Sequence, residues 1–270
     1  MQCYKNGQLI DSIPLLDRAF HYGDGCFTTA RLVHGGMELK ELHIARLNYA
    51  CKNLSLDADL SFIDQALDQL LQHEKNLNGT LKVVISRGEG DRGYSLPLHP
   101  ADVYVWFYPK QWQHLEPEWI ESGLLNHAIG LHMPHLVGLK TLNRLEQVVL
   151  KQEADQRGWL EALVTDVQGY IVEGVSSNCF IRTNDQWITP ELRYNGVHGV
   201  MRAHILSRMQ QNHISCEQRC IEMDQIAHIQ NIFFCNALHP MKAVVRFQGR
   251  TMQQQPYLDL FNSLKLSQID

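Results

Sequence analysis

Residues 138–154 read GLKTLNRLEQVVLKQEA and place a lysine, Lys140, just ahead of a helix. The apolar residues that follow recur at helical spacing: Leu142, Leu145, Val148 and Val149. Thr141 or Asn143 can cap this helix. A lysine in a partly apolar setting either extends its amine to water or is held dry for a chemical purpose. Taken alone, the segment favours the solvated interpretation, because most lysines are solvated.

The bulk composition is that of an ordinary globular protein with 270 residues, 44% hydrophobic and 20% charged. A net charge of −5 gives no basis for a nucleic-acid or anionic-membrane surface. The first residues lack the apolar core of a signal peptide, and no run is long enough to span a bilayer. Seven scattered cysteines without a CxxC pair are typical of reduced thiols. We therefore expect a cytoplasmic protein that binds neither nucleic acid nor membrane.

Fourteen histidines raise the possibility of a metal site. His132 and His135 are three residues apart, but Pro134 between them argues against one helical face. The chain also lacks the HExxH pattern. We therefore expect no metal.

The order of expected elements predicts an α+β architecture, because hairpins outnumber βαβ units. Strands are expected at residues 124–131 and on either side of the Asn6-Gly7 turn, and a helix over residues 60–73. Residues 109–123 are polar and contain two prolines, which is typical of a connection between domains. We expect a small N-terminal domain over residues 1–110, a linker over 111–122 and a larger domain over 123–270.

A glycine-rich stretch, GEGDRG at residues 88–93, matches the GxGxxG pattern of dinucleotide-binding proteins. That site needs the last glycine to enter a helix, whereas here two prolines follow within seven residues. The stretch therefore predicts a loop. Its Arg92 and Tyr94 are either carboxylate-binding groups or ordinary residues of an exposed loop.

Three further features belong to one kind of chemistry. Lys140 supplies an amine, and Glu173 is a carboxylate at the end of an apolar strand, where it needs a cation. Gly196 and Gly199 precede a helix, so that free backbone amides could face a phosphate, and Arg46 could add a charged fork. Pyridoxal phosphate needs such an amine, carboxylate and phosphate cradle. Spacing alone does not bring the three together.

Five ordered motifs carry a resemblance to a known family: YGDG (22–25), HIARL (43–47), KTLNRLEQVVLKQEA (140–154), EGVSSNCF (173–180) and GVMR (199–202). They resemble the fold-type IV pyridoxal-phosphate enzymes, which include branched-chain and D-amino-acid aminotransferases and aminodeoxychorismate lyases. The resemblance implies a small N-terminal α/β sandwich, a larger C-terminal pseudo-barrel, and a homodimer with its active site near the subunit interface.

Within the family, the motifs are most similar to those of the aminodeoxychorismate lyases. The marks are GDGCFTTAR (23–31), LKVVISRGEGDRGYS (81–95), GLKTLNRLEQV (138–148) and CNALHPM (235–241). Similar aminotransferases carry an aromatic residue and a glutamate where this chain has Phe27 and Thr28. The resemblance implies conversion of 4-amino-4-deoxychorismate to 4-aminobenzoate and pyruvate in folate biosynthesis. A D-amino-acid or branched-chain aminotransferase, or a cofactor-binding protein without turnover, remains open.

The resemblance also assigns roles to individual residues. Lys140 corresponds to the lysine that forms a Schiff base with pyridoxal phosphate, and Thr28 to a proton relay near the leaving group. The remaining cofactor-binding residues are Glu173 at the ring nitrogen, Val197 at the ring face, and Arg46, Val200, Met201 and Asn236 at the phosphate. Arg92 and Tyr94 are the candidates for the substrate carboxylates.

Overall fold

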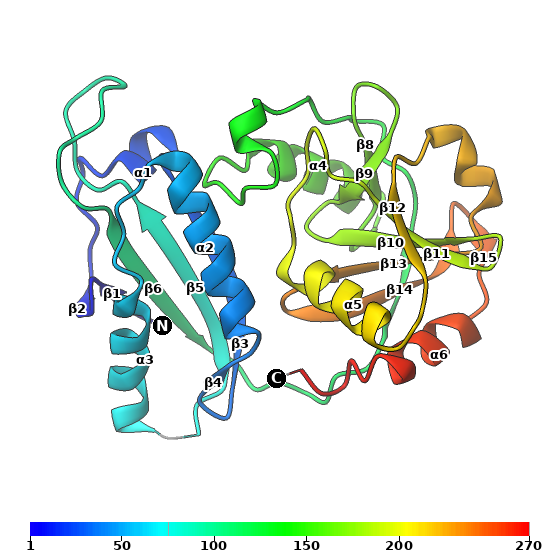
Figure 1. Ribbon diagram of the computed structural model, residues 1–270, viewed down its shortest axis with the longest axis horizontal. Helices are drawn as coiled ribbons and strands as arrows, with labels where there is room; N and C mark the ends of the chain where they lie inside the picture. Colours follow the sequence, from blue (N-terminus) through cyan, green and yellow to red (C-terminus); the bar gives the residue numbers. More distant parts are fainter. Residues whose placement is uncertain (75, 270) are drawn as a thin grey trace. The chain divides into compact units, whose positions relative to one another are not determined.

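The computed structural model describes residues 1–74 and 76–269, and the chain forms two compact units. Unit 1 comprises Met1–Gln113 and Leu139–Asn143, and unit 2 comprises His114–Gly138 and Arg144–Ile269. Each unit combines helices with a β-sheet (Figure 1), which confirms the α+β class. Among the described residues, none of the helices is long and apolar enough to cross a membrane.

Unit 1 is built on a six-stranded antiparallel sheet with the strand order β2-β1-β6-β5-β3-β4. Its strands are β1 (Gln2–Lys5), β2 (Gln8–Ile10), β3 (Gly25–Val33), β4 (Gly36–Met37), β5 (Gly79–Ser86) and β6 (Asp102–Pro109). Its helices are α1 (Arg18–Tyr22), α2 (Lys40–Leu54) and α3 (Ser61–His73). The two longer helices, α2 and α3, cover one face of the sheet (Figure 1).

Local sequence explains these elements. The buried residues of α3 recur at helical spacing and form its sheet-facing side: Ile63, Ala66, Leu67 and Leu70. Asn6 and Gly7 both have positive φ angles, of 49° and 76°, as the tight turn between β1 and β2 requires. The expected hairpin at Asn6-Gly7 and the helix near residues 60–73 are confirmed.

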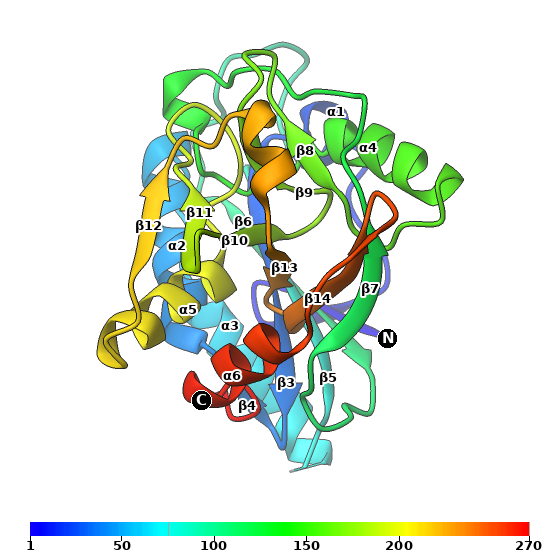
Figure 2. The same ribbon diagram turned by 90° about the vertical axis from the view of Figure 1, so that its right-hand side faces the viewer.

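Unit 2 contains a seven-stranded mixed sheet and a separate hairpin (Figure 2). The sheet strands are β7 (Glu118–Ser122), β10 (Asn178–Thr183), β11 (Gln186–Pro190), β12 (Cys216–Arg219), β13 (Asn231–Asn236), β14 (His239–Phe247) and β15 (Arg250–Thr251). The hairpin strands are β8 (Leu163–Thr165) and β9 (Ile171–Gly174). The helices are α4 (Leu145–Gln156), α5 (Val200–Gln211) and α6 (Gln255–Ser263), with 3-10 turns η1 (Pro134–Leu136) and η2 (Met223–His228).

Two expectations near the start of unit 2 need correction. Residues 111–122 are not a linker throughout, because they contain β7, which pairs in parallel with β14 and buries Ile120 and Ser122. The alternation of this short strand is hidden in the sequence because its exposed Trp119 is apolar and its buried Ser122 is polar. The strand expected at 124–131 is reduced to isolated bridges, because the amides of Asn126 and His127 donate to the Glu153 carboxylate of α4 at 2.8 and 3.0 Å.

Replacing Leu70 by Ala should destabilise unit 1. Leu70 lies on the sheet-facing side of α3 and is 2% exposed. A Leu→Ala cavity costs about 2–5 kcal/mol of stability. Urea unfolding followed by circular dichroism should show a lower midpoint for Leu70→Ala, whereas Gln72→Ala, at an exposed position of the same helix, should unfold as the parent does. Equal midpoints for the two variants would contradict this account of the core.

Candidate active site

Lys140 lies in a short extended segment, Leu139–Asn143, called here the lysine segment. This segment pairs with the beginning of β3: the Phe27 amide donates to the Lys140 carbonyl at 2.9 Å, and the Leu142 amide donates to the Gly25 carbonyl at 3.0 Å. Backbone bonds at the Lys140 carbonyl and two residues later therefore fix the point from which its side chain extends.

The lysine segment also corrects the expected helix cap. The Asn143 side-chain amide donates to the Gly23 carbonyl at 3.0 Å, and α4 begins only at Leu145, without a side-chain cap. Asn143 therefore ties the lysine segment to the YGDG stretch and does not cap α4.

The Lys140 amine lies over an aromatic ring that it shares with a second lysine. Its Nζ is 4.7 Å from the centre of the Phe27 ring, and Nζ of Lys82, on β5, is 5.3 Å from the same centre. Cations are attracted to the face of an aromatic ring. The Phe27 ring therefore contacts the amino groups of two lysines.

Thr28 lies on the other face of the sheet from Phe27, because side chains alternate along β3. It is fully buried beneath α2, where its Oγ1 contacts Nδ1 of His43 at 2.5 Å and accepts a hydrogen bond from Nη2 of Arg46. This position argues against the proton-relay role expected for Thr28. Its hydroxyl instead fixes the guanidinium of Arg46.

Sequence reasoning missed Thr29, the next residue along β3. Thr29 lies on the same face as Phe27, is partly exposed, and is opposite Lys82 in the strand register. The two-residue period of a strand was the signal that could have distinguished Thr29 from Thr28.

Arg46 is buried beside two uncharged side chains, Thr28 and His43. Burial lowers the pKa of Arg46 to about 10, and burial with a smaller contribution from the Arg46 charge lowers the pKa of His43 to about 3. His43 is therefore neutral near pH 7. Nε of Arg46 is buried without a hydrogen-bond partner. An enclosed guanidinium with such a donor fits an anionic ligand such as phosphate.

In unit 2, Glu173 is the penultimate residue of β9 and is 6% exposed. Its Oε2 accepts hydrogen bonds from the Val197 amide at 3.0 Å and from the Asn178 side chain at 3.4 Å. Asn178 also donates to the Val197 carbonyl at 2.9 Å. Glu173 therefore binds the amide of Val197, and Asn178 binds its carbonyl. These bonds give the buried Glu173 carboxylate a defined orientation.

Val197 belongs to a glycine turn, residues 196–199, that leads into α5. Gly196 has a φ of +76°, and a Cβ on Gly199 would lie 1.9 Å from Oδ1 of Asn178. Only glycine fits at these two positions. No side chain caps the start of α5, so the amides of its first turn, which includes the buried residues Val200 and Met201, suit a phosphate.

The side chain of Asn236, which was expected at the phosphate, is bonded to three groups of the protein. Its Oδ1 accepts from the amides of Leu238 and His239, and its Nδ2 donates to Oγ of Ser177, each at 3.0 Å. Ser177 in turn donates to the fully buried Glu161 at 2.7 Å. Asn236 therefore supports the SSN stretch of the EGVSSNCF motif. Glu161 was missed, although a glutamate before the apolar run ALV was its signal.

Arg92 and Tyr94 lie in the irregular connection between β5 and β6, as expected for a loop. Both side chains are exposed. The loop leaves β5 after Ser86, which is opposite Gly25 at the beginning of β3, so that it starts at the same end of the sheet as the lysine segment. Among residues 1–74 and 76–269, no group of three His, Cys, Asp or Glu side chains is placed to hold a metal ion.

The candidate residues therefore divide into two groups. Lys140, Thr28, Arg46, Arg92 and Tyr94 belong to unit 1. The residues in unit 2 are Glu173, Val197, Val200, Met201 and Asn236. In each group, the side chains present fit a piece of one cofactor: an amine and a guanidinium in unit 1, and a carboxylate and a helix N-terminus in unit 2.

Comparison with known proteins identifies the family. Residues 25–247 match the family described as amino-transferase class IV. An aminodeoxychorismate lyase from Vibrio harveyi is 29% identical over 238 residues, which is 86% of each protein. A D-alanine aminotransferase from Bacillus licheniformis is 25% identical over 93% of this chain and 90% of its own length.

The fold has a similar counterpart among solved structures. The crystal structure of 4-amino-4-deoxychorismate lyase from Pseudomonas aeruginosa superposes with a TM-score of 0.86 at 29% identity, covering 97% of this chain and 98% of that one. The resemblance inferred from the motifs is thereby confirmed. The chain belongs to the class IV aminotransferase family, the fold-type IV enzymes whose cofactor is pyridoxal phosphate.

Proposed function

We propose that this protein is an aminodeoxychorismate lyase, which converts 4-amino-4-deoxychorismate to 4-aminobenzoate and pyruvate for folate biosynthesis in the cytoplasm. Two of the similar proteins described above, from Vibrio harveyi and Pseudomonas aeruginosa, carry the name of this lyase, each at 29% identity. The reaction breaks one carbon–oxygen bond and leaves an aromatic ring. It therefore needs proton transfers, but it needs no second substrate to accept the amino group.

The observation that carries the proposal is the pair of ammonium groups at the Phe27 ring. Lys140 and Lys82 lie 4.7 and 5.3 Å from its centre, and the Thr29 hydroxyl shares their face of the sheet. A substrate with two carboxylates is attracted to the Lys82 ammonium, while the Lys140 amine at the same ring is available to the cofactor aldehyde. One lysine is then available for the chemistry and the other for binding.

Pyridoxal phosphate, when bound, supplies an aldehyde that takes up amines and a ring that withdraws electrons from them. We assign Lys140 to the aldehyde, and Glu173, held by the Val197 amide, to the ring nitrogen. We assign the phosphate to Arg46 and to the amides of Val200 and Met201. Val197 contributes its side chain to the ring face.

The residues of the chain then have separate tasks. Nζ of Lys140 removes the proton from the amine-bearing carbon of the substrate. The Thr29 hydroxyl donates a proton to the ether oxygen as the ring carbon–oxygen bond breaks, and it takes a proton in return from the Lys140 ammonium, which gained that proton from the substrate carbon. The released enolpyruvate then tautomerises to pyruvate. Thr28 keeps Arg46 in position from the opposite face of β3. Arg92 and Tyr94 bind a substrate carboxylate.

An aminotransferase is the second candidate. The Bacillus licheniformis relative, at 25% identity and 90% coverage, carries the name D-alanine aminotransferase. A transaminase needs the same cofactor residues, but it also needs a keto acid as the second substrate. The two functions therefore differ in a measurable requirement.

Product analysis decides between them. The purified, cofactor-loaded protein is incubated with 4-amino-4-deoxychorismate and no keto acid, and pyruvate and 4-aminobenzoate are followed together. Equimolar release over many turnovers supports the lyase. Absence of release, together with turnover of D- or branched-chain amino acids when 2-oxoglutarate is added, assigns the protein to transamination.

Substitution of Lys140 by Ala should abolish the visible absorbance of the covalently held cofactor and lower turnover by several orders of magnitude. Glu173→Gln should keep that absorbance and lose most turnover, because the ring nitrogen loses its anionic partner. Absorbance spectra and steady-state rates check both. A Lys140→Ala protein that retains the parent spectrum would exclude Lys140 as the attachment point.

The two neighbouring threonines should give different results. Thr29→Val should slow product release by about 10²–10⁴-fold, as expected for loss of an acid catalyst, with cofactor binding unchanged. Thr28→Val should weaken cofactor binding by about tenfold, because Arg46 loses a hydrogen bond worth ~1–1.5 kcal/mol. Cofactor titration and rates separate the two effects, and the reverse pattern would return the proton relay to Thr28.

We also propose that the protein forms a homodimer. Three apolar side chains on α4 are exposed in the single chain: Leu145 at 76%, Val148 at 63% and Val149 at 39%. They lie at i, i+3 and i+4, and so form one continuous strip beside a surface hollow that Val148 and Val175 line. A strip of this kind is typical of a surface that another protein covers.

Val148→Glu should shift the protein from dimer to monomer at micromolar concentration, because a charge would be buried in the interface. Size-exclusion chromatography with light scattering measures the mass. Met223→Glu, which changes an equally exposed apolar residue outside α4, should leave the mass unchanged. A monomeric parent protein, or a dimeric Val148→Glu variant, would rule out this strip as the interface.

A further inference from the structure

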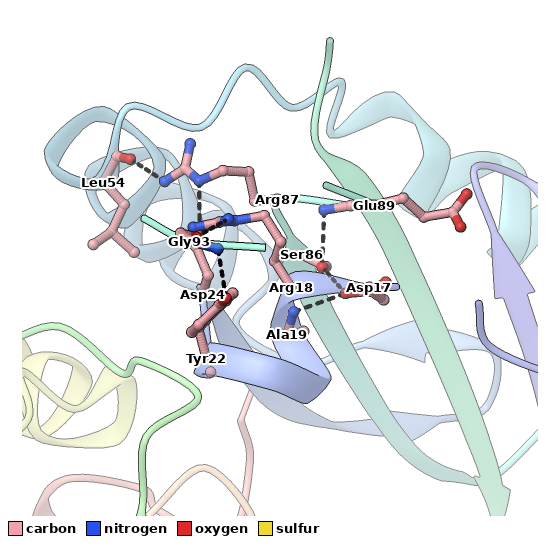
Figure 3. A network of polar contacts seen from close by, with 12 residues as sticks. Asp17, Arg18, Ala19, Tyr22, Asp24, Leu54, Ser86, Arg87, Glu89 and Gly93 are labelled. Atoms are coloured by element: carbon pink, nitrogen blue, oxygen red, sulfur yellow. Dashed lines mark hydrogen bonds and ion pairs between the residues drawn. The ribbon is translucent and has the colours of Figure 1, made fainter. Parts of the chain in front are cut away.

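The tip of the loop between β5 and β6 is bonded to α1 through the backbone of one residue, Gly93. The Gly93 amide donates to the Tyr22 hydroxyl, and the Gly93 carbonyl accepts from Nη1 of Arg18, both at 2.9 Å (Figure 3). Gly93 separates Arg92 from Tyr94, and the Tyr94 ring lies 5.6 Å from the Tyr22 ring. Both candidate substrate residues are therefore adjacent to a glycine whose amide and carbonyl are bonded to α1.

Arg18 makes this contact while it is itself fixed. It is 3% exposed, its Nε donates to Oδ2 of Asp24 at 2.9 Å, and its guanidinium lies 4.8 Å from the centre of the Tyr22 ring. A guanidinium has five donors in one plane, so one side chain can join a carboxylate, a carbonyl and a ring. We call Arg18, Tyr22 and Asp24 the Arg18 clamp.

Asp24 connects the clamp to the rest of unit 1. Its Oδ2 also accepts from Nε of Arg87 at 2.8 Å, and Arg87 donates to the carbonyls of Leu54 and Ser55 at the end of α2 (Figure 3). Burial raises the pKa of Asp24, but the hydrogen bonds and charges of Arg87 and Arg18 outweigh it and hold the pKa below its usual range. Asp24 is therefore a carboxylate near neutral pH.

The clamp is joined to the start of β3, which lies between the lysine segment and the end of β5. Asp24 directly precedes Gly25, and the Gly25 carbonyl accepts from the amide of Leu142, two residues after Lys140. On the other side, Gly25 is opposite Ser86, where β5 ends and the loop begins. One short stretch of chain therefore fixes the lysine segment on one side and the loop on the other.

We propose that Arg18 and Tyr22 are positioning residues that hold Arg92 and Tyr94 in place to receive a carboxylate of the substrate. The inference rests on the proposed function, because it takes Arg92 and Tyr94 as substrate-binding groups. Arg18 and Tyr22 donate to and accept from the backbone of Gly93, so that they act through the loop. The clamp therefore determines how well substrate binds and leaves the chemical step alone.

Two variants loosen the clamp without removing a side chain. Tyr22→Phe keeps the ring and removes the hydroxyl that accepts from Gly93. Arg18→Lys keeps the charge near Asp24, but one ammonium cannot reproduce the planar fork. Tyr49→Phe, at a 51% exposed position on α2, is the matched control.

The first readout does not depend on activity. Arg92 is an exposed trypsin site, and cleavage between Arg92 and Gly93 requires the peptide to leave the clamp. In the cofactor-loaded protein, mass spectrometry should show cleavage there about 5-fold faster in Tyr22→Phe, which lacks one neutral hydrogen bond, and tenfold or more in Arg18→Lys, which disturbs charged ones. The control should be cleaved at the parent rate.

The second readout separates binding from chemistry. KM for the substrate should rise by the same factors, with kcat and the cofactor absorbance unchanged. A cleavage rate equal to the parent rate in both variants overturns the clamp, whatever the substrate is. Faster cleavage with an unchanged KM overturns the positioning role. If the parent does not convert 4-amino-4-deoxychorismate, the proposed function fails, and the clamp is then judged by cleavage and by KM for the amine that the protein does use.

Discussion

The backbone pairing between the lysine segment and the beginning of β3 is the constraint on which the candidate site depends. Phe27 donates to the Lys140 carbonyl, and Leu142 donates to the Gly25 carbonyl, so the lysine extends from a backbone that is bonded at Lys140 itself and two residues later. Lysine side chains are long and lose much rotamer entropy when they are ordered. A fixed origin and an aromatic ring at 4.7 Å restrict the region that the amine samples.

Buried charge is handled in the same way in both units. Asp24 accepts from two arginines, and Glu173 accepts from the Val197 amide and Asn178. An isolated carboxylate in a protein interior would take up a proton, since burial disfavours its charged form. Hydrogen bonds to these oxygens compensate for lost solvation and also fix the orientation of the carboxylates.

Much of the fold could be predicted from local sequence, and the residues that we propose for the cofactor were chosen from the same local signals. The NG turn, the periodicity of α3, and the ordered motifs around Lys140 and Glu173 are short-range signals that need no knowledge of the neighbours. The irregular stretch after β7 could not be predicted, because a distant carboxylate, Glu153, takes the amides that a strand would have used. The support that Glu161 gives to Ser177, 16 residues away, is likewise absent from any local pattern.

The sequence by itself determined which chemistry this protein holds: an amine at Lys140, a carboxylate at Glu173, and glycines ahead of a helix. Tertiary structure decided which neighbours act with them. The alternation of β3 puts Thr29 beside the Phe27 ring and Thr28 beneath α2 with Arg46, although the two threonines are adjacent and identical in type. The physical reason is that residue type fixes what a group can do, whereas its partners depend on the face of the strand and on segments distant in the chain.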